Sequence, residues 1–307
     1  MNTYVAKRAW IYSIPLPLLE AGMILTWSSG FVGARFSLDH APAMLVVFWR
    51  CLVVMLVLLP FVVRQLLRAS PAALLHHLGI GLLAMAGYLA GVVQGIALGV
   101  PAGLAALLAD LLPIGVAVLS AALFRQRLAA RTWVGLAIGL IGVVLVTHDA
   151  LALGSAPLWA YALPLLGMLS LAAATLWQKR TKSDASIGVL PNLWLQALVS
   201  SLAFAILASM DGDLWPVAST GFAVSVLWTA ILSSLGGYGL YWLCLRRSTP
   251  TRLASVLYLS PAVTLVWAWA MFGDPLSWLM LLGTAVSVVG VWMVVRAESR
   301  VPQVCGT

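Results

Sequence analysis

Two acidic side chains lie inside apolar stretches of the chain, where a carboxylate needs a specific reason to be. Asp110 lies about nine residues into the run 101–123, which is about 14 Å along a helix and close to the middle of a bilayer. Because a carboxylate is costly there, it binds a substrate ammonium, carries a coupling proton, or is protonated and hydrogen-bonded to another helix. Glu20, between Pro17 and Trp27, is a second candidate coupling acid, although its position near the interface also allows it to be hydrated.

Aromatic and amide side chains in other apolar stretches could form the wall of a binding cavity. Trp27 and Tyr88 lie near the middle of their runs, and Tyr258 is similarly embedded, so each could stack on an apolar or aromatic ligand. Contact with lipid or packing between helices is an equally open interpretation for each of them. Gln94 adds a polar group that could bind a ligand, beside glycines whose four-residue spacing favours close helix approach.

A third group of candidates lies toward one end of the apolar runs. Tyr241, together with Tyr238 and Trp242, and Trp177 on another run could line an inner vestibule, although an interfacial aromatic belt is the stronger interpretation. Arg50 is also embedded in an apolar run. We expect it to snorkel or to pair with a neighbouring helix rather than to bind substrate.

The amino-acid composition indicates whether these side chains belong to a protein in water or in a lipid bilayer. Apolar residues make up 63% of the 307 positions and charged residues only 8%, against about a quarter in an ordinary soluble domain. Nine acids and 17 bases cannot cover the surface of a soluble protein of this size. The chain is therefore predicted to be an all-α integral membrane protein.

About 20 apolar residues are needed for a helix to cross a hydrocarbon core of about 30 Å. Helices are required because an open strand leaves backbone groups unsatisfied in lipid. The sequence predicts ten transmembrane helices, near residues 14–34, 43–63, 76–98, 101–123, 132–148, 157–177, 189–209, 222–245, 251–272 and 276–295.

The distribution of basic residues predicts which side of the membrane each connection faces. Fifteen of the 17 Lys and Arg residues fall on alternate connections, while Arg35 lies on the other side and Arg50 within the second span. Because cytoplasmic loops of bacterial membrane proteins carry the Lys and Arg excess, we expect a multi-pass protein of the bacterial inner membrane. Both termini are then expected to be cytoplasmic.

An internal repeat indicates that the ten spans arose by duplication of a five-span unit. Residues 103–147 match residues 251–295 at a fixed offset of 148 with twelve identities and no gap, including Pro113 with Pro261. Each of these prolines removes a helical hydrogen bond and is predicted to kink its span, as a hinge or as a static bend.

The repeat divides the chain into two five-span halves, 1–150 and 151–307. An odd number of spans forces the second half to enter the membrane in the opposite orientation, and such inverted repeats are typical of secondary transporters. The repeat also makes Tyr258 the counterpart of Asp110. If this position faces a cavity in both halves, the acid and the phenol approach the same substrate from opposite sides.

Several short segments make the chain similar to a known family. Trp27–Val32 resembles the tryptophan and small-residue segment of EamA-type proteins of the drug/metabolite transporter superfamily. Leu259–Pro261, followed by Phe272–Leu276, resembles the end of the family's ninth span and its glycine-acid turn, whereas Arg125–Gln126 departs from that turn in the first half. The resemblance implies ten spans, cytoplasmic termini and two five-span halves. In length and embedded aromatic residues the chain looks most like the YddG-type aromatic amino acid exporters.

These observations favour a secondary transporter or facilitator that exports small organic metabolites by alternating access around a midplane cavity. The preferred substrates are aromatic or other hydrophobic amino acids. The alternative is broad export of cationic or amphipathic drugs and metabolites. The expected partners are a small-molecule substrate and membrane lipids, and both a monomer and a homodimer remain open.

Other classes of function find less support in the residues. An intramembrane enzyme could use only the cluster of Asp39, His40, His148 and Asp149, which lacks metal or nucleophile spacing, so the chain is predicted not to be an enzyme. The sequence offers neither the filter segment of a channel nor a nucleotide-binding P-loop. Its bases lie in short groups between spans, which argues against nucleic acid, and no cofactor or metal is expected.

Overall fold

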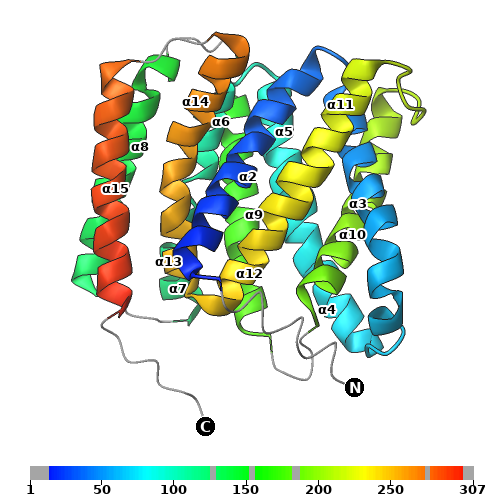
Figure 1. The fold of residues 1–307 in the computed structure, drawn as a ribbon, viewed down its shortest axis with the longest axis horizontal. Coiled ribbons are helices and arrows are strands. Elements are labelled where there is room, and N and C mark those ends of the chain that lie inside the picture. Colours follow the sequence, from blue (N-terminus) through cyan, green and yellow to red (C-terminus); the bar gives the residue numbers. More distant parts are fainter. Residues whose placement is uncertain (1–13, 125–128, 152–155, 182–186, 274–276, 300–307) are drawn as a thin grey trace.

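A computed structural model describes residues 14–124, 129–151, 156–181, 187–273 and 277–299 (Figure 1). Ten helical spans occur in these ranges, and no strand does, which confirms the predicted all-α architecture. The first five spans are α2 (Leu16–Leu38), α3 (Ala43–Leu66), α4–η1–α5 (Pro71–Gly81, Leu82–Gly87, Tyr88–Ala97), α6–α7 (Ala102–Ala109, Leu112–Phe124) and α8 (Ala130–Leu151). The second five are η2–α9 (Leu158–Tyr161, Ala162–Lys179), α10 (Val189–Asp211), α11–η4–α12 (Thr220–Trp228, Thr229–Tyr238, Gly239–Arg247), α13–η5–α14 (Pro250–Val256, Leu257–Leu259, Ser260–Phe272) and α15 (Trp278–Ser299).

The hydropathy of these helices agrees with membrane spans. Among the described residues, 7 helices are long and apolar enough to cross a membrane, and α8 and α15 contain the shorter apolar stretches Ala130–Gly142 and Ala285–Val294. The remaining span, α2, is 23 residues long and carries Glu20 and Arg35. Each of the ten predicted runs therefore coincides with an observed helical span, with ends that differ by a few residues.

Local sequence determines where several spans begin. The side-chain oxygens of Ser70, Ser219 and Thr249 accept hydrogen bonds from the backbone N–H groups at the starts of α4, α11 and α13. Such caps satisfy N–H groups that have no partner within the first turn. Prolines at 15 and 42 precede α2 and α3. These five spans thus start after a proline or at a residue that caps the helix.

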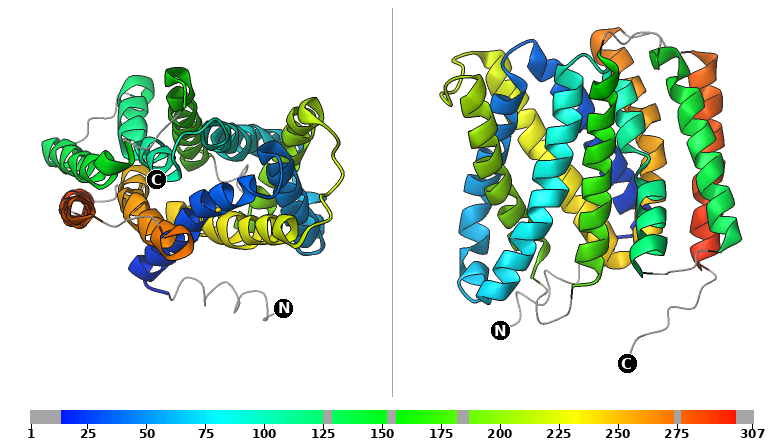
Figure 2. Two further views of the ribbon diagram at one scale, coloured as in Figure 1. Left: turned by 90° about the horizontal axis from the view of Figure 1, so that it is seen from above. Right: turned by 180° about the vertical axis from the view of Figure 1, so that it is seen from behind.

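Consecutive spans run in opposite directions through the bundle (Figures 1 and 2). As a result, the start of α2 and the end of α15 lie at the same end of the molecule. Every described Lys and Arg except Arg35 and Arg50 lies at or near this end, which we call the basic end. The ribbon thus gathers on one side the basic connections that the sequence places on alternate loops.

The repeat seen in the sequence recurs in the helix boundaries. Helices α7 and α14, and likewise α8 and α15, have bounds that differ by the same offset of 148. Helices α8 and α15 lie side by side at one edge of the bundle (Figures 1 and 2). They approach so closely that a side chain on Gly142 or Gly290 would collide with the backbone of the partner helix.

Two of the spans are interrupted rather than evenly kinked. The fourth span breaks at Asp110, the C-cap of α6, and Pro113 lies in the first turn of α7. The ninth span passes through the 3₁₀ turn η5, and Pro261 lies in the first turn of α14. Proline is tolerated in a first turn because its missing N–H would have no partner there. The breaks therefore precede the prolines, at equivalent places in the two halves.

The third and eighth spans contain π-helical segments, η1 and η4. A π-helical turn is closed by hydrogen bonds between residues i and i+5, one residue further than in the α-helix, and it is frequent at functional sites. It changes the direction in which the following side chains point. The two segments therefore place residues of α5 and α12 on faces that a regular 3.6-residue period does not predict.

Candidate binding cavity

A partly open cavity lies between α2, α3, the third span and η4, with about 330 Å³ of empty space when its opening is included. Its wall is mainly apolar and aromatic, with Trp27, Tyr88 and Tyr238 among the lining residues. Arg50 and Ser233 supply polar groups to the same cavity. An apolar space with a few polar groups is the usual form of a small-molecule site.

Trp27 is the centre of the aromatic wall. Its ring centroid lies 5.4 Å from that of Tyr88 and 5.1 Å from that of Tyr238, with both pairs tilted by 47°. On its other side Trp27 stacks on Tyr241, with centroids 5.3 Å apart and planes at 25°. These separations are typical of favourable aromatic pairs, so Trp27 is held by neighbours on three sides. Of the sequence-predicted candidates, the structure brings Trp27, Tyr88 and Tyr241 together.

Tyr88 and Tyr238 occupy related positions in the two halves. Each follows a glycine at the end of a π-helical segment, Tyr88 directly after η1 and Tyr238 as the last residue of η4. The Tyr238 hydroxyl donates a hydrogen bond of 3.1 Å to the Ala84 carbonyl within η1, which ties the two segments together. The interpretation of Tyr238 as a belt residue was therefore wrong, because its side chain is only 1% exposed and lines the cavity.

Arg50 is the principal polar group of the cavity and only 3% of it is exposed. Its Nε donates to the Ser234 hydroxyl at 2.6 Å, and its Nη2 donates to the Ser233 hydroxyl at 2.9 Å. Both serines belong to η4, so α3 and the eighth span hold the guanidinium jointly. Of the two alternatives expected for Arg50, snorkelling does not occur, because Arg50 is enclosed. It does pair with a neighbouring helix, but only through neutral hydroxyl groups.

The charge of Arg50 has no acidic partner in the described part of the chain. The ion pairs there join Arg35 to Asp39 and Arg252 to Glu20. A buried charge without a counter-ion is costly, and inside a membrane protein it is usually functional. The cavity therefore combines aromatic walls with an uncompensated positive charge.

Asp110 and Tyr258 are both buried, but neither lines this cavity. Asp110 contacts the Ser260 hydroxyl, which lies 3.2 Å from that of Ser28, while its Oδ2 has no hydrogen-bond partner. The Tyr258 ring fills the space beside Gly139 of α8, and its hydroxyl also lacks a partner. The predicted approach of acid and phenol to one substrate is thus not seen at the aromatic cavity.

Two other candidates also lie outside the cavity lining. Trp177 is 39% exposed and packs over Gly79, and its ring centroid lies 5.2 Å from that of His76. Gln94 is half-buried on α5. The glycines of this span have a packing role, because a side chain on Gly91 would collide with α9.

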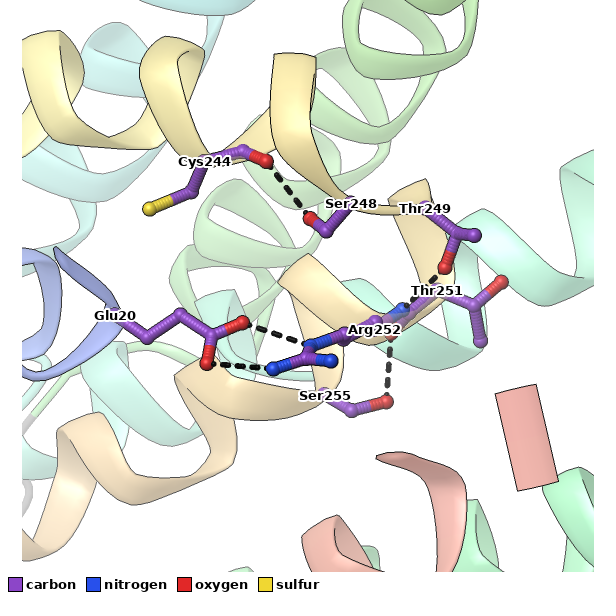
Figure 3. Close-up of polar contacts among 7 residues, drawn as sticks. All are labelled: Glu20, Cys244, Ser248, Thr249, Thr251, Arg252 and Ser255. Carbon is purple, nitrogen blue, oxygen red and sulfur yellow. Dashed lines mark hydrogen bonds and ion pairs between the residues drawn. The ribbon is translucent and has the colours of Figure 1, made fainter. Parts of the chain in front are cut away.

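Glu20 forms an ion pair at the basic end (Figure 3). The Arg252 guanidinium donates from Nε to one Glu20 oxygen at 2.9 Å and from Nη2 to the other at 3.1 Å. Glu20 is only 6% exposed, so the alternative of a hydrated carboxylate was wrong. The pair joins α2 to the start of α13, next to the turn where the Ser248 hydroxyl donates to the Cys244 carbonyl. It thus fastens the first half of the chain to the second.

Comparison with protein families agrees with this architecture. The sequence model of the EamA-like transporter family matches residues 17–148 and, a second time, residues 158–296. The chain belongs to the EamA-like transporter family. The two matches fall on the two sets of five spans, so this EamA-like transporter is a multi-pass membrane protein.

Several relatives cover nearly the whole EamA-like transporter. A protein of Salmonella typhimurium named "Probable amino-acid metabolite efflux pump" is 27% identical over 279 residues, covering 88% of this chain and 91% of its own. The "Uncharacterized inner membrane transporter YedA" of Escherichia coli is 25% identical, covering 94% and 93%. One solved crystal structure has the same fold, with a TM-score of 0.74 at 19% identity over 92% of this chain and 98% of that one.

Sequence reasoning did not assign Tyr238 or Arg50 to the cavity of this EamA-like transporter. A signal for Tyr238 exists, because the Gly87–Tyr88 and Gly237–Tyr238 pairs recur at an offset of 150. For Arg50 the signal is its charge in the middle of an otherwise apolar span. The direction of its side chain depends on serines from a distant helix, which a pattern along one span does not show.

Proposed function

We propose that this EamA-like transporter exports small metabolites that carry a carboxylate and an aromatic or hydrophobic side chain, with amino acids as the leading class. The observation that carries the proposal is Arg50, buried in an aromatic cavity with no acidic partner among the described residues. The planar guanidinium fork matches a carboxylate better than any other side chain does. Trp27, Tyr88 and Tyr238 then pack around the side chain of the substrate.

The basic end gives the orientation of the transporter in the membrane, and the proposed export then gives the path of the substrate. Because Lys and Arg gather on the cytoplasmic side of bacterial inner-membrane proteins, we assign the basic end and both termini to the cytoplasm. Substrate then enters at this end and leaves at the end that carries Arg35 and Asp39. The name of the Salmonella efflux pump supports export, and that of the Escherichia coli inner membrane transporter YedA supports the inner membrane as the location.

Alternating access requires that the two halves, 1–150 and 151–307, move against each other around the cavity. The Glu20–Arg252 pair fastens the basic end and opens when that end admits substrate. The breaks before Pro113 and Pro261 supply equivalent flexible points in the two halves. The cavity then faces one side of the membrane at a time.

Export of cationic compounds is the competing proposal, and it would be favoured by an acid in the cavity. Asp110 is the nearest candidate by depth, but it does not line the cavity. We therefore assign to Asp110 a role in coupling rather than in direct binding. Its unpartnered Oδ2 is a place where a proton can be taken up and released.

Replacing Asp110 by asparagine tests this coupling role. The amide keeps the shape of the side chain and its contact with Ser260 but cannot exchange a proton. We expect Asp110→Asn to retain substrate binding and to lose the stimulation of flux by a proton gradient, as measured in proteoliposomes at several imposed pH differences. The matched control is Asp110→Glu, which should keep the stimulation. If the asparagine variant responds to pH as the wild type does, Asp110 has no coupling role.

The substrate class is tested with purified protein in liposomes preloaded with unlabelled amino acid. We expect counterflow of radiolabelled L-tryptophan and L-phenylalanine above that of empty liposomes, because both fit a carboxylate anchor with aromatic walls. Tryptamine, which lacks the carboxylate, serves as the control substrate. Flux of both amino acids equal to that of empty liposomes under several gradients would reject the proposed class.

A further inference from the structure

Asp110 belongs to a group of buried polar side chains that lies outside the lining of the aromatic cavity. Its carboxylate contacts the Ser260 hydroxyl, whose oxygen lies 3.2 Å from that of Ser28. Thr264 follows Ser260 by one helical turn, on the same face of α14. These four residues, which we call the oxygen cluster, come from α2, the end of α6 and α14, three helices that pack against one another. None of the four is more than 1% exposed.

The oxygen cluster contains more acceptors than its own hydroxyl groups can satisfy. The Asp110 Oδ2 and the Thr264 Oγ1 have no hydrogen-bond partner. The Ser28 hydroxyl can donate to the Ser260 carbonyl at 3.2 Å, and the Ser260 hydroxyl can donate to Asp110, after which neither serine has a hydrogen left. Buried acceptors without donors are costly. A bound cation would satisfy several of these oxygens at once.

The break in the fourth span adds a backbone oxygen next to Asp110. Asp110 is the C-cap of α6, and Pro113 lies four residues after Ala109. Because proline has no N–H, the Ala109 carbonyl lacks the donor that a continuous helix would give it. The end of α6 also carries the negative end of the helix dipole. In secondary transporters, such half-helix ends and unwound carbonyls typically coordinate Na⁺ or a proton.

We propose that the oxygen cluster is a Na⁺ site, at which Na⁺ takes the place of the coupling proton on Asp110. All of its ligands are oxygens, which hard cations prefer. The single carboxylate balances one positive charge, whereas a divalent ion would leave a net charge inside the bilayer. Ca²⁺, an ion of nearly the same size as Na⁺, lies about 2.3–2.6 Å from its oxygen ligands, so two hydroxyls 3.2 Å apart can both reach such an ion.

The oxygen cluster is linked to the aromatic cavity through neighbouring side chains. Ser28 directly follows Trp27, the centre of the aromatic wall. Tyr88, from the same wall, interacts electrostatically with both Asp110 and Arg50. Tyr88 and Tyr258 are titratable groups that face Asp110, from the third and ninth spans. An ion at Asp110 therefore acts on the cavity wall. This role in coupling rests on the proposed function, whereas binding of the ion does not.

Equilibrium binding of radioactive Na⁺ to purified protein in detergent tests the site without any substrate. We expect wild-type protein to bind one Na⁺ per chain and Asp110→Asn to bind none. Thr264→Val keeps the shape of the side chain but removes one oxygen, and we expect it to bind Na⁺ about tenfold more weakly, which corresponds to about 1.4 kcal/mol.

Thr229→Val is the matched control, because it makes the same change at another buried threonine. The Thr229 hydroxyl donates to the Ser225 carbonyl of its own span at 2.7 Å and lies outside the oxygen cluster. We expect this variant to bind Na⁺ as the wild type does. Absence of Na⁺ binding in the wild type, binding that persists in Asp110→Asn, or an equal loss in the two valine variants would overturn the site.

Transport separates the Na⁺ site from the proposed function. In proteoliposomes with equal pH on both sides, a Na⁺ gradient opposed to the movement of L-tryptophan should accelerate that movement in wild type but not in Asp110→Asn. Na⁺ binding that depends on Asp110, without an effect on flux, would support the site and reject its role in coupling. The same binding without any flux of L-tryptophan would support the site and reject the proposed cargo.

Discussion

Replacement of Arg50 by glutamine is expected to abolish transport of carboxylate substrates without unfolding the protein. Loss of a buried partner of a bound charge costs at least about 2 kcal/mol, which corresponds to about a 30-fold loss of affinity. The stability of the folded protein, in contrast to transport, should not fall. Removing a buried charge that has no counter-ion is neutral or stabilising, so the melting temperature in detergent should stay constant or rise.

The combination of lost flux and retained stability distinguishes a binding role from a structural one. Counterflow of radiolabelled L-tryptophan and thermal unfolding should be measured on the same preparation. Arg50→Lys is the matched control, because it keeps the charge but loses the planar fork, and its flux should fall between wild type and glutamine. A glutamine variant that transports as well as wild type would remove Arg50 from the binding site.

Breaking the ion pair between Glu20 and Arg252 is expected to open the basic end. In Glu20→Gln the bidentate link between α2 and α13 is lost, and a contribution of about 1.4 kcal/mol would shift the balance toward the open form about tenfold. Cys244 reports the change because it is fully buried next to the pair (Figure 3). Its alkylation by maleimide should accelerate by a similar factor in protein that lacks Cys305.

Reversal of the pair provides the control for this prediction. The double variant Glu20→Arg with Arg252→Glu restores opposite charges and should slow the alkylation of Cys244 toward the wild-type rate. Each single charge reversal should leave it fast, because like charges then repel. Unchanged reactivity of Cys244 in Glu20→Gln would show that the pair does not hold this end closed.

Much of the fold could be predicted because the bilayer restricts what the chain can do. Each span must be an apolar helix of a certain length, so hydropathy located all ten, and the repeat predicted equivalent helices α7 and α14. Embedded aromatic residues were also informative. Trp27 and Tyr88 were identified as candidates from depth alone, and they form the wall of the cavity.

The rest of the candidate site could not be predicted because it depends on how the helices are rotated. The segment η4 is a π-helix, so the faces of Ser233, Ser234 and Tyr238 do not follow the regular helical period. These are the residues that hold Arg50 or line the cavity with it. Asp110 and Tyr258 share a repeat position and a depth, yet the breaks in their spans leave both outside the cavity lining.

The most direct test of a carboxylate anchor is equilibrium binding of paired ligands to the purified transporter, measured by isothermal titration calorimetry. L-Tryptophan, indole-3-propionate and tryptamine share the indole ring, but only the first two carry a carboxylate. We predict that both carboxylates bind wild-type protein at least about tenfold more tightly than tryptamine, and that Arg50→Gln removes the difference. Tryptamine binding as tightly as L-tryptophan, or a preference that survives in Arg50→Gln, would contradict the assignment of Arg50 as the substrate anchor.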